Sequence, residues 1–287
     1  MPISTPKLET INEQWKYFND TKNFSEKRSI KLLKSTWEYW VCGKGEKTLI
    51  FFHGAMIGPE MWFYPIDALK KEYSIIVPVI PLTLSSVAEV IDFYQRLITI
   101  EEIKHKTLIG YSYGGGLVQL LIDFLPEQID RVVLTHTGLL WGRKEVPSPR
   151  LLKIFFKILP VSIVRRILKK KRIENYSDSP WNQFHRDYFS QRMDKLKKQT
   201  LYDYFDGATA FLNDYIGQEP EIKRFNGPVI LMGTEGDKDA FYAMEKFREF
   251  FPDALEHVFM ESGGHHYIFL HPEKYTQELY RLLKQTE

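Results

Sequence analysis

Residues 106–116 read Lys-Thr-Leu-Ile-Gly-Tyr-Ser-Tyr-Gly-Gly-Gly and contain the clearest local signal in the chain. The apolar run that ends at Tyr111 predicts a buried strand, and residues 114–125 predict a helix. Between them lies a Gly-x-Ser-x-Gly pattern centred on Ser112. A strand that turns sharply into a helix leaves room only for small residues two positions before and after the serine. The pattern therefore predicts a nucleophilic serine in a strained turn at a helix N-terminus.

Strand and helix signals alternate on both sides of this turn. Short apolar runs rich in β-branched and aromatic residues predict strands at 36–41, 48–52, 74–77, 129–135, 228–233 and 255–260. Apolar residues at helical spacing predict helices at 59–71, 87–99, 240–251 and 272–284. Because such alternating strands pair in parallel through right-handed crossovers, we expect an α/β fold with a mostly parallel sheet and helices on both faces.

Two local patterns add detail. The runs 36–41 and 48–52 are joined by a Gly-Lys-Gly turn, so we predict that they form a hairpin. Ser85-Ser86 is followed by Glu89, a spacing typical of a capped helix start.

The alternation stops near residue 138 and resumes at residue 228. Residues 139–215 are helical and aromatic in character, which predicts a helical cap inserted over the carboxyl edge of the sheet, where ligands of open α/β sheets bind. The core then comprises 36–138 and 216–287, preceded by an N-terminal extension over 1–35.

The composition is that of a soluble globular protein, with 44% hydrophobic and 26% charged residues among 287. No apolar run approaches the length of about 20 residues that crosses a bilayer, and the first 35 residues contain no secretory core. The single cysteine, Cys42, excludes an intrachain disulfide and a cysteine-based zinc site. We therefore expect a cytoplasmic protein.

The chain resembles the α/β-hydrolase superfamily from about Trp37 to Leu283. Besides the serine turn, Phe-Phe-His-Gly at 51–54 is similar to the family's strand that ends in His-Gly, and residues 126–134 resemble the stretch after the nucleophile helix. The resemblance implies a serine hydrolase of the esterase or lipase kind, with an inserted cap and without cofactor or metal. Dehalogenases and epoxide hydrolases of this fold use Asp at the turn, so Ser112 excludes those branches.

The resemblance also implies the partners of Ser112, because the family's chain order is serine, acid, histidine. Gly264-His265 follows the last predicted strand, which makes His265 the candidate base and the adjacent His266 an alternative. The acid follows strand 228–233, where Asp237 is preferred and Asp239 is also acceptable.

For the oxyanion hole the resemblance implies two backbone N–H groups. Tyr113, which follows the nucleophile, supplies one, and Ala55 supplies the other, with Met56 as the alternative if the turn is one residue longer. The sequence Pro-Val-Ile-Pro-Leu-Thr at 78–83 replaces an Asp and a glycine-rich loop found in many relatives.

The predicted cap combines aromatic and basic residues. The aromatic side chains favour an apolar acyl or aryl pocket and include Trp141, Phe155, Phe156, Tyr176, Trp181, Phe184, Tyr188 and Phe189. Residues 143–172 carry eleven Lys or Arg against one acid, in a chain whose net charge is +2. Within them, 160–172 reads as a basic amphipathic helix. It is either a solvated cap helix or a weak contact for an anionic membrane surface or acidic substrate; the acidic balance of the remaining chain disfavours nucleic acid.

Acyl chemistry on a small-molecule substrate is therefore the expected function. The leading hypothesis is hydrolysis of a carboxylic ester through an acyl-enzyme. A thioesterase, an amidase, a carbon–carbon bond hydrolase and a non-catalytic ligand-binding scaffold of the same fold are the alternatives.

Overall fold

An eight-stranded sheet forms the centre of the molecule. The computed structural model describes residues 3–140, 159–172, 178–215 and 225–287. The strand order is β1-β2-β4-β3-β5-β6-β7-β8, and every pair from β4 to β8 in this order is parallel, whereas β1 and β2 run antiparallel to their neighbours. The strands are β1 Glu26–Lys31, β2 Thr36–Cys42, β3 Lys47–Phe52, β4 Ser74–Val79, β5 His105–Tyr111, β6 Arg131–Thr135, β7 Val229–Thr234 and β8 Leu255–Phe259. The prediction of a mostly parallel sheet is confirmed.

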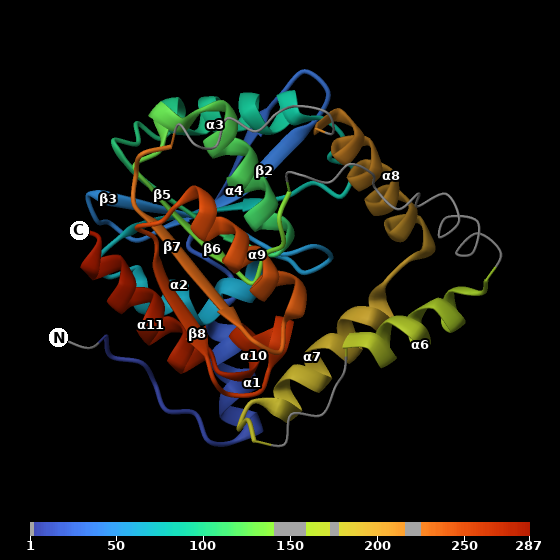
Figure 1. The fold of residues 1–287 in the computed structure, drawn as a ribbon. Helices are drawn as coiled ribbons and strands as arrows, with labels where there is room; N and C mark the ends of the chain where they lie inside the picture. Colours follow the sequence, from blue (N-terminus) through green and yellow to red (C-terminus); the bar gives the residue numbers. More distant parts are fainter. Residues whose placement is uncertain (1–2, 141–158, 173–177, 216–224) are drawn as a thin grey trace.

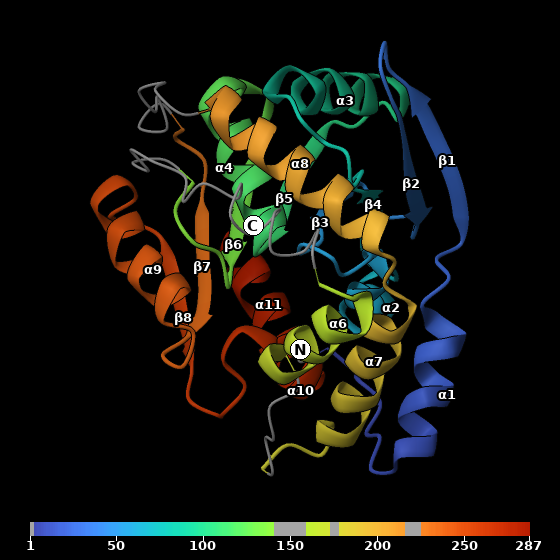
Figure 2. The same ribbon diagram turned by 90° about the vertical axis from the view of Figure 1, so that its right-hand side faces the viewer.

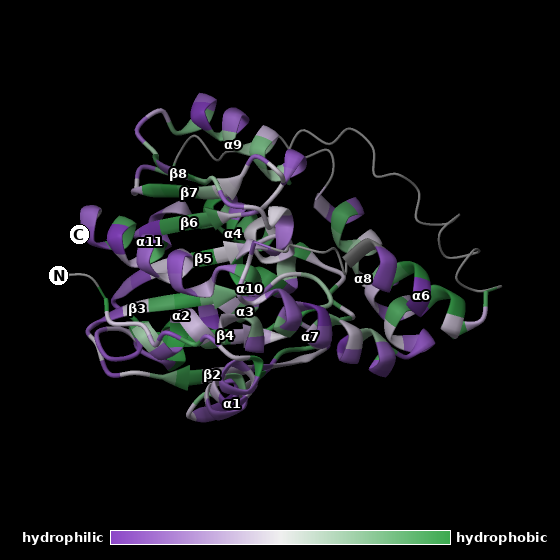
Figure 3. Cartoon of the chain, turned by 90° about the horizontal axis from the view of Figure 1, so that it is seen from below, coloured by the Kyte–Doolittle hydropathy of each residue, from purple (hydrophilic) through white to green (hydrophobic). Residues whose placement is uncertain are grey.

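Two layers of helices cover the sheet (Figure 1). Successive strand residues point to opposite faces, so Ile50 and Phe52 join the core under α3, α4 and α9, whereas Leu49 and Phe51 join the core under α2 and α11. Figure 3 shows that the inner strands β3, β6 and β7 are mainly hydrophobic, as burial on both faces requires. The core helices are α2 Phe63–Leu69, α3 Val87–Ile100, α4 Tyr113–Phe124, α9 Lys238–Phe250, α10 Tyr267–Leu270 and α11 Pro272–Gln285.

The predicted hairpin of residues 36–41 and 48–52 is wrong. Strand β2 pairs with β1 and β4, and β3 pairs with β4 and β5. The Gly-Lys-Gly connection passes the start of β4 so closely that a Cβ on Gly43 would lie 2.0 Å from the carbonyl oxygen of Tyr73. The glycines therefore allow a backbone crossing rather than a tight turn.

The first 35 residues contain helix α1, Ile11–Thr21, and strand β1. The hairpin of β1 with β2 extends the sheet at one edge. Strand β1 carries charged residues on its exposed positions, which discourages pairing with another chain. Helix α1 packs against the cap: the rings of Trp15 and Phe184 lie 4.7 Å apart.

The predicted cap contains three described helices, α6 Val161–Arg172, α7 Asn182–Lys195 and α8 Lys198–Tyr215. Figure 2 shows α8 crossing near α3 and β4, with α6 and α7 side by side below it. Residues 141–158 and 173–177 of the predicted cap, including Trp141, Phe155, Phe156 and Tyr176, lie outside the described residues. Within the described ranges, no helix is both long and apolar enough to cross a membrane.

Helix α3 begins where predicted, but its cap differs from the prediction. Ser86 occupies the N-cap position without a side-chain hydrogen bond. The N–H of Val87 instead donates to Asp214 Oδ2 in cap helix α8, at 2.8 Å. Glu89 accepts from Ser35 Oγ and Trp37 Nε1, at 2.5 and 2.9 Å, so its carboxylate ties β2 and the residue before it to α3 rather than closing a capping box.

Candidate active site

Ser112 lies at the turn from β5 into α4. Its φ of 53° and ψ of −118° place it in a strained conformation for a residue with a Cβ. A Cβ on Gly110 would lie 2.6 Å from Gly114 O, and one on Gly114 would lie 2.2 Å from Phe52 O. Both glycines are therefore required where the strand, the helix and β3 meet. The Ser112 N–H donates to Thr135 O at 3.2 Å, which fixes the turn against β6.

The structure brings Ser112, His265 and Asp237 together at the carboxyl edge of the sheet. Ser112 Oγ lies 2.8 Å from His265 Nε2, and His265 Nδ1 lies 2.5 Å from Asp237 Oδ2. Because a carboxylate only accepts, Nδ1 carries the proton and Nε2 is left to accept from the Ser112 hydroxyl. His265 is partly exposed, so a substrate can reach its Nε2.

The two alternatives left open in the sequence occupy different places. Asp237 is buried and is the N-cap residue of α9, where its Oδ1 faces the Ala240 N–H at 3.5 Å. Asp239 is exposed in the first turn of the same helix. His266 points away from Ser112 and lies 2.6 Å, Nδ1 to Nε2, from His185 of α7.

The loop that carries His265 is held by the residue before the nucleophile. The Tyr111 hydroxyl donates to His265 O. Gly264 has a φ of 47°, a conformation that favours glycine, and it lets the chain turn His265 toward Ser112. The two residues of this contact are 154 positions apart in sequence, so no local pattern predicts it.

The turn after β3 lies against Ser112, because a Cβ on Gly54 would be 3.6 Å from Ser112 Cβ. The Gly54 carbonyl accepts from His53 Nδ1 at 2.9 Å and from the Ile57 N–H at 3.4 Å. These two bonds fix the orientation of the peptide group between Gly54 and Ala55. Because this peptide is trans, the Ala55 N–H points opposite to the Gly54 carbonyl. Tyr113 is the first residue of α4, so its N–H has no partner within the helix. The two candidate oxyanion donors thus belong to the two backbone segments next to Ser112, the turn after β3 and the start of α4.

His53 fixes this turn in one tautomer. Its Nε2 accepts from the Ile80 N–H at 3.0 Å, so its Nδ1 carries the proton and donates to Gly54 O. Complete burial lowers the pKa of His53 to about 4 and keeps the ring neutral. Ile80 belongs to the Pro-Val-Ile-Pro-Leu-Thr segment, and its backbone N–H is the partner that fixes the His53 ring.

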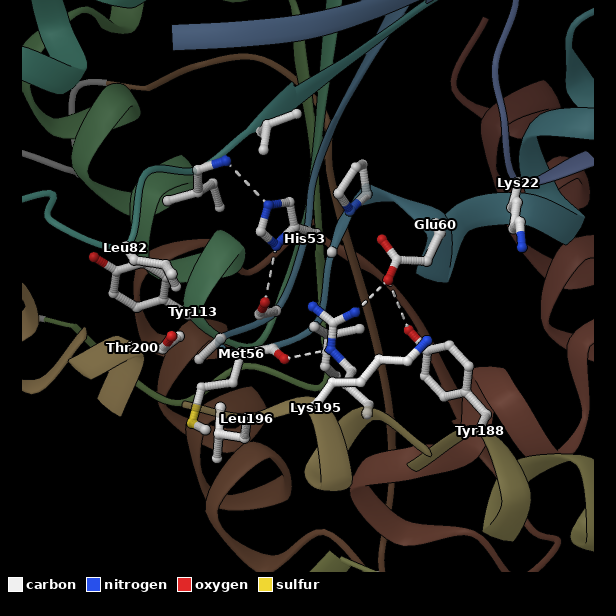
Figure 4. Close-up of a pocket in the computed structure, with 18 of the residues that line it drawn as sticks. Lys22, His53, Met56, Glu60, Leu82, Tyr113, Tyr188, Lys195, Leu196 and Thr200 are labelled. Atoms are coloured by element: carbon white, nitrogen blue, oxygen red, sulfur yellow. Dashed lines mark hydrogen bonds and ion pairs between the residues drawn. The ribbon is translucent and has the colours of Figure 1, made fainter. Parts of the chain in front are cut away.

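A pocket of about 890 Å³ opens beside this turn (Figure 4). Its walls come from α1, the turn after β3, the loop after β4, α7 and α8. The lining includes Gly54, Ala55 and Tyr113 but not the side chains of Ser112, Asp237 or His265, so the pocket meets the candidate site from the oxyanion side. The apolar lining residues are Trp15, Phe18, Trp40, Ala55, Met56, Ile57, Pro59, Val79, Ile80, Pro81, Leu82, Leu196 and Ala208.

Among the described cap aromatics, Tyr188 lines the pocket, whereas Trp181, Phe184 and Phe189 are buried in the core shared with α1 and α2. Arg192 and Lys195 of α7 also line the pocket, together with Lys22 of α1 and Glu60. Within the described residues, no group of three His, Cys, Asp or Glu side chains is arranged to hold a metal ion.

The comparison with protein families agrees with this geometry. A model of the "Alpha/beta hydrolase family" matches residues 49–278, which include the serine turn, the cap and the histidine loop. The chain belongs to the alpha/beta hydrolase family.

Solved structures of other alpha/beta hydrolases share the fold at low sequence identity. A bromoperoxidase from Bacillus anthracis is 19% identical, with 90% of this chain and 100% of that chain covered and a TM-score of 0.69. An N-acyl homoserine lactone degrading enzyme is 15% identical, with 88% and 99% covered and a TM-score of 0.70.

One curated protein also matches this alpha/beta hydrolase. The dihydrolipoyllysine-residue acetyltransferase component of the acetoin cleaving system of Cupriavidus necator is 23% identical over 161 residues, which are 48% of this chain. The match spans only 43% of that relative's length. The similarity therefore locates a shared segment and says nothing of the relative's whole activity.

Proposed function

We propose that this alpha/beta hydrolase cleaves a carboxylic ester, or a related acyl bond, through an acyl-enzyme on Ser112. The observation that carries the proposal is the hydrogen-bonded chain from Ser112 Oγ through His265 to Asp237 Oδ2. A nucleophile, a base within reach of its proton and a carboxylate that orients the base are the three parts of this chemistry.

Each step follows from the position of the His265 proton. Ser112 Oγ attacks the carbonyl carbon while its proton moves to His265 Nε2, and the carbonyl oxygen becomes an oxyanion between the Ala55 and Tyr113 N–H groups. The bond to the leaving oxygen then breaks as Nε2 returns the proton to it. A water repeats the sequence on the acyl-enzyme, with the acid as product and Ser112 restored. Asp237 stabilises the imidazolium and keeps its own charge.

The pocket suggests which part of the substrate lies where. The leaving group has to lie near His265 Nε2, because that atom protonates it. The pocket meets the site at Gly54, Ala55 and Tyr113, on the oxyanion side, so it suits the acyl portion. Its apolar lining favours an aliphatic or aryl acyl group.

A thioesterase, an amidase or a carbon–carbon bond hydrolase would use the same residues, and a ligand-binding scaffold would use the pocket alone. The solved structures named above include an enzyme that degrades a lactone, which is a cyclic ester. That substrate contains both an amide and an ester, so acyl chemistry is the part of the proposal to which this likeness adds, and the positioned His265 favours an enzyme over a scaffold.

The test combines a covalent label with a substrate series. A fluorophosphonate should add once to the wild-type protein, as seen by intact mass, and p-nitrophenyl esters of increasing chain length should be hydrolysed. Ser112→Ala should abolish both, whereas Ser29→Ala on the exposed edge strand should change neither. Labelling of a different serine, or equal turnover by Ser112→Ala, would exclude this function.

A further inference from the structure

One face of cap helix α7 reaches both halves of the candidate machinery. Residues 185, 188 and 192 lie three and four positions apart and therefore share a face. His185 Nε2 lies 2.6 Å from His266 Nδ1, next to the candidate base. Tyr188 donates to Glu60 at 3.1 Å, and Arg192 contacts the turn after β3. Figure 4 shows Met56, Glu60 and Tyr188 around this second contact.

The Arg192 guanidinium joins two groups of the oxyanion turn. Its Nε donates to the Met56 carbonyl at 2.7 Å, and its Nη1 donates to Glu60 Oε1. The Glu60 carboxylate in turn lies over Gly58, where a Cβ would be 1.9 Å from Oε2. The fork geometry of a guanidinium presents a separate N–H group to each of the two acceptors, an arrangement that the single nitrogen of a lysine does not reproduce.

The segment that Arg192 holds is strained. Met56 has a φ of 59°, in the left-handed region that residues other than glycine rarely adopt. Such a conformation persists only where the surroundings impose it. The core holds the near end of the turn through His53 and Ile57, which both donate to Gly54 O. The far end, at the Met56 carbonyl, is held from the cap.

We propose that Arg192 is a positioning residue that keeps the oxyanion turn in its active conformation from the cap. This proposal rests on the proposed acyl-enzyme function. Without the guanidinium, the Met56 carbonyl loses a charge-assisted donor, the turn relaxes toward ordinary φ values, and the Ala55 N–H moves relative to Ser112. Arg192 thereby acts on the transition state, in which the oxyanion exists, more than on substrate binding.

The test compares Arg192→Met and Arg192→Lys with wild type on a small neutral p-nitrophenyl ester. Arg192→Met should lower kcat by about tenfold or more and change KM by less than about threefold, the signature of an interaction made in the transition state. The affinity for phenylboronic acid, which forms a tetrahedral adduct on the serine, should fall in parallel with kcat/KM. Arg192→Lys should be intermediate in both measurements. Arg166→Met removes an exposed cap cation that makes no hydrogen bond or ion pair to another described residue, and it should leave both unchanged.

Two results would overturn the proposal. One is a kcat and a boronate affinity within about twofold of wild type for both Arg192 variants. The other is a loss confined to KM, which would make Arg192 a pocket residue only. If Arg192→Met does not fold, the milder Arg192→Lys still decides, with thermal unfolding as the check. Wild-type protein that neither turns over nor reacts with a fluorophosphonate would instead contradict the proposed function itself.

Discussion

Asp237 has two tasks in this structure, and they make different demands on the side chain. One oxygen accepts the hydrogen bond from His265 Nδ1–H, and the other faces the N-terminus of α9. Asparagine can still cap the helix but cannot carry the charge that favours the imidazolium. We therefore expect Asp237→Asn to fold and to lose kcat by about 10⁴-fold, as the same change of Asp to Asn does in a serine-protease triad.

Asp239→Asn is the matched control, because Asp239 is exposed in the first turn of the same helix. Its kcat should stay near that of wild type. A crippled Asp239→Asn beside a nearly normal Asp237→Asn would show that the acid is the other carboxylate. Stopped assays with the same p-nitrophenyl ester measure both variants.

The residues of the candidate triad can be predicted from the sequence, whereas the residues that support them cannot. Ser112 and His265 stand in short patterns with fixed neighbours, so a local reading finds them. Asp237 can be predicted from its place just after a predicted strand, although a second carboxylate two positions later kept the choice open. The role of His53 depends on Ile80, 27 positions away, and that of Arg192 on Met56, 136 positions away. Periodicity and spacing carry no information about such contacts.

Cap helix α8 helps to start core helix α3. Asp214 Oδ2 accepts from the Val87 N–H, whereas the Ser86 hydroxyl makes no capping bond. Asp214→Ala should therefore lower the free energy of unfolding by about 1 kcal/mol, as loss of a cap does. Ser86→Ala should cost only a few tenths of a kcal/mol. Urea denaturation measures both, and the reverse ranking would contradict the cap contact.

Of the four basic residues at positions 165, 166, 169 and 170 of helix α6, two make contacts with other described residues. Arg165 donates twice to Leu196 O, at 3.0 and 2.7 Å, and Lys169 contacts Ser190 Oγ and Asp194 Oδ2, at 2.9 and 2.8 Å. Arg166 and Lys170 remain exposed. The basic residues at 143–157 lie outside the described residues.

We propose that α6 contributes only weakly to binding an anionic membrane surface. Arg166 and Lys170 together would supply about 2 kcal/mol near anionic lipid, and salt would screen them. Co-sedimentation with anionic vesicles should be detectable at low salt only, and the double variant Arg166→Gln with Lys170→Gln should reduce it. Neutral vesicles should bind neither protein. Binding that survives physiological salt or the double variant would assign the contact to another segment.

The positions of the predicted strands agree with the structure, but the order of the strands in the sheet was not fully predicted. Every predicted strand is present within a few residues, because alternating apolar runs report burial directly. The predicted pairing of β2 with β3 was wrong, because the sequence of the connection does not show that β4 lies between these two strands in the sheet. Gly43 and Gly45 are typical of a hairpin turn in sequence, but in the structure they let the backbone pass close to the start of β4.

The whole molecule should lose stability in mild acid through its buried histidines. Burial lowers the pKa of His53 and His185 to about 4 and that of His136 to about 3. The unfolded chain titrates these groups near 6.5 and so binds more protons than the folded state between about pH 6.5 and pH 4. The free energy of unfolding therefore has its full value above about pH 6.5 and decreases as the pH falls through this window. The loss is up to about 2 kcal/mol per histidine between pH 7 and pH 5.

His136 allows this dependence to be assigned. It has a φ of 45° and is fully buried, with its ring stacked 5.5 Å from that of Tyr111. His136→Asn keeps a residue that tolerates left-handed backbone and removes the titrating group. Urea unfolding at pH 7, 6 and 5 should give a shallower pH slope for the variant than for wild type. Identical slopes would mean that His136 does not titrate differently in the folded and unfolded states.

The contact of Arg192 with Met56 has a consequence for how this enzyme can diversify. Inserted segments are usually regarded as interchangeable modules that alter specificity on a constant scaffold. Here the insertion also carries a structural support for the turn beside the nucleophile. A chimera that receives residues 139–215 from another member would gain a new pocket and lose that support, unless the donor brings an equivalent arginine. We therefore expect such a chimera to change substrate range and catalytic rate together rather than separately.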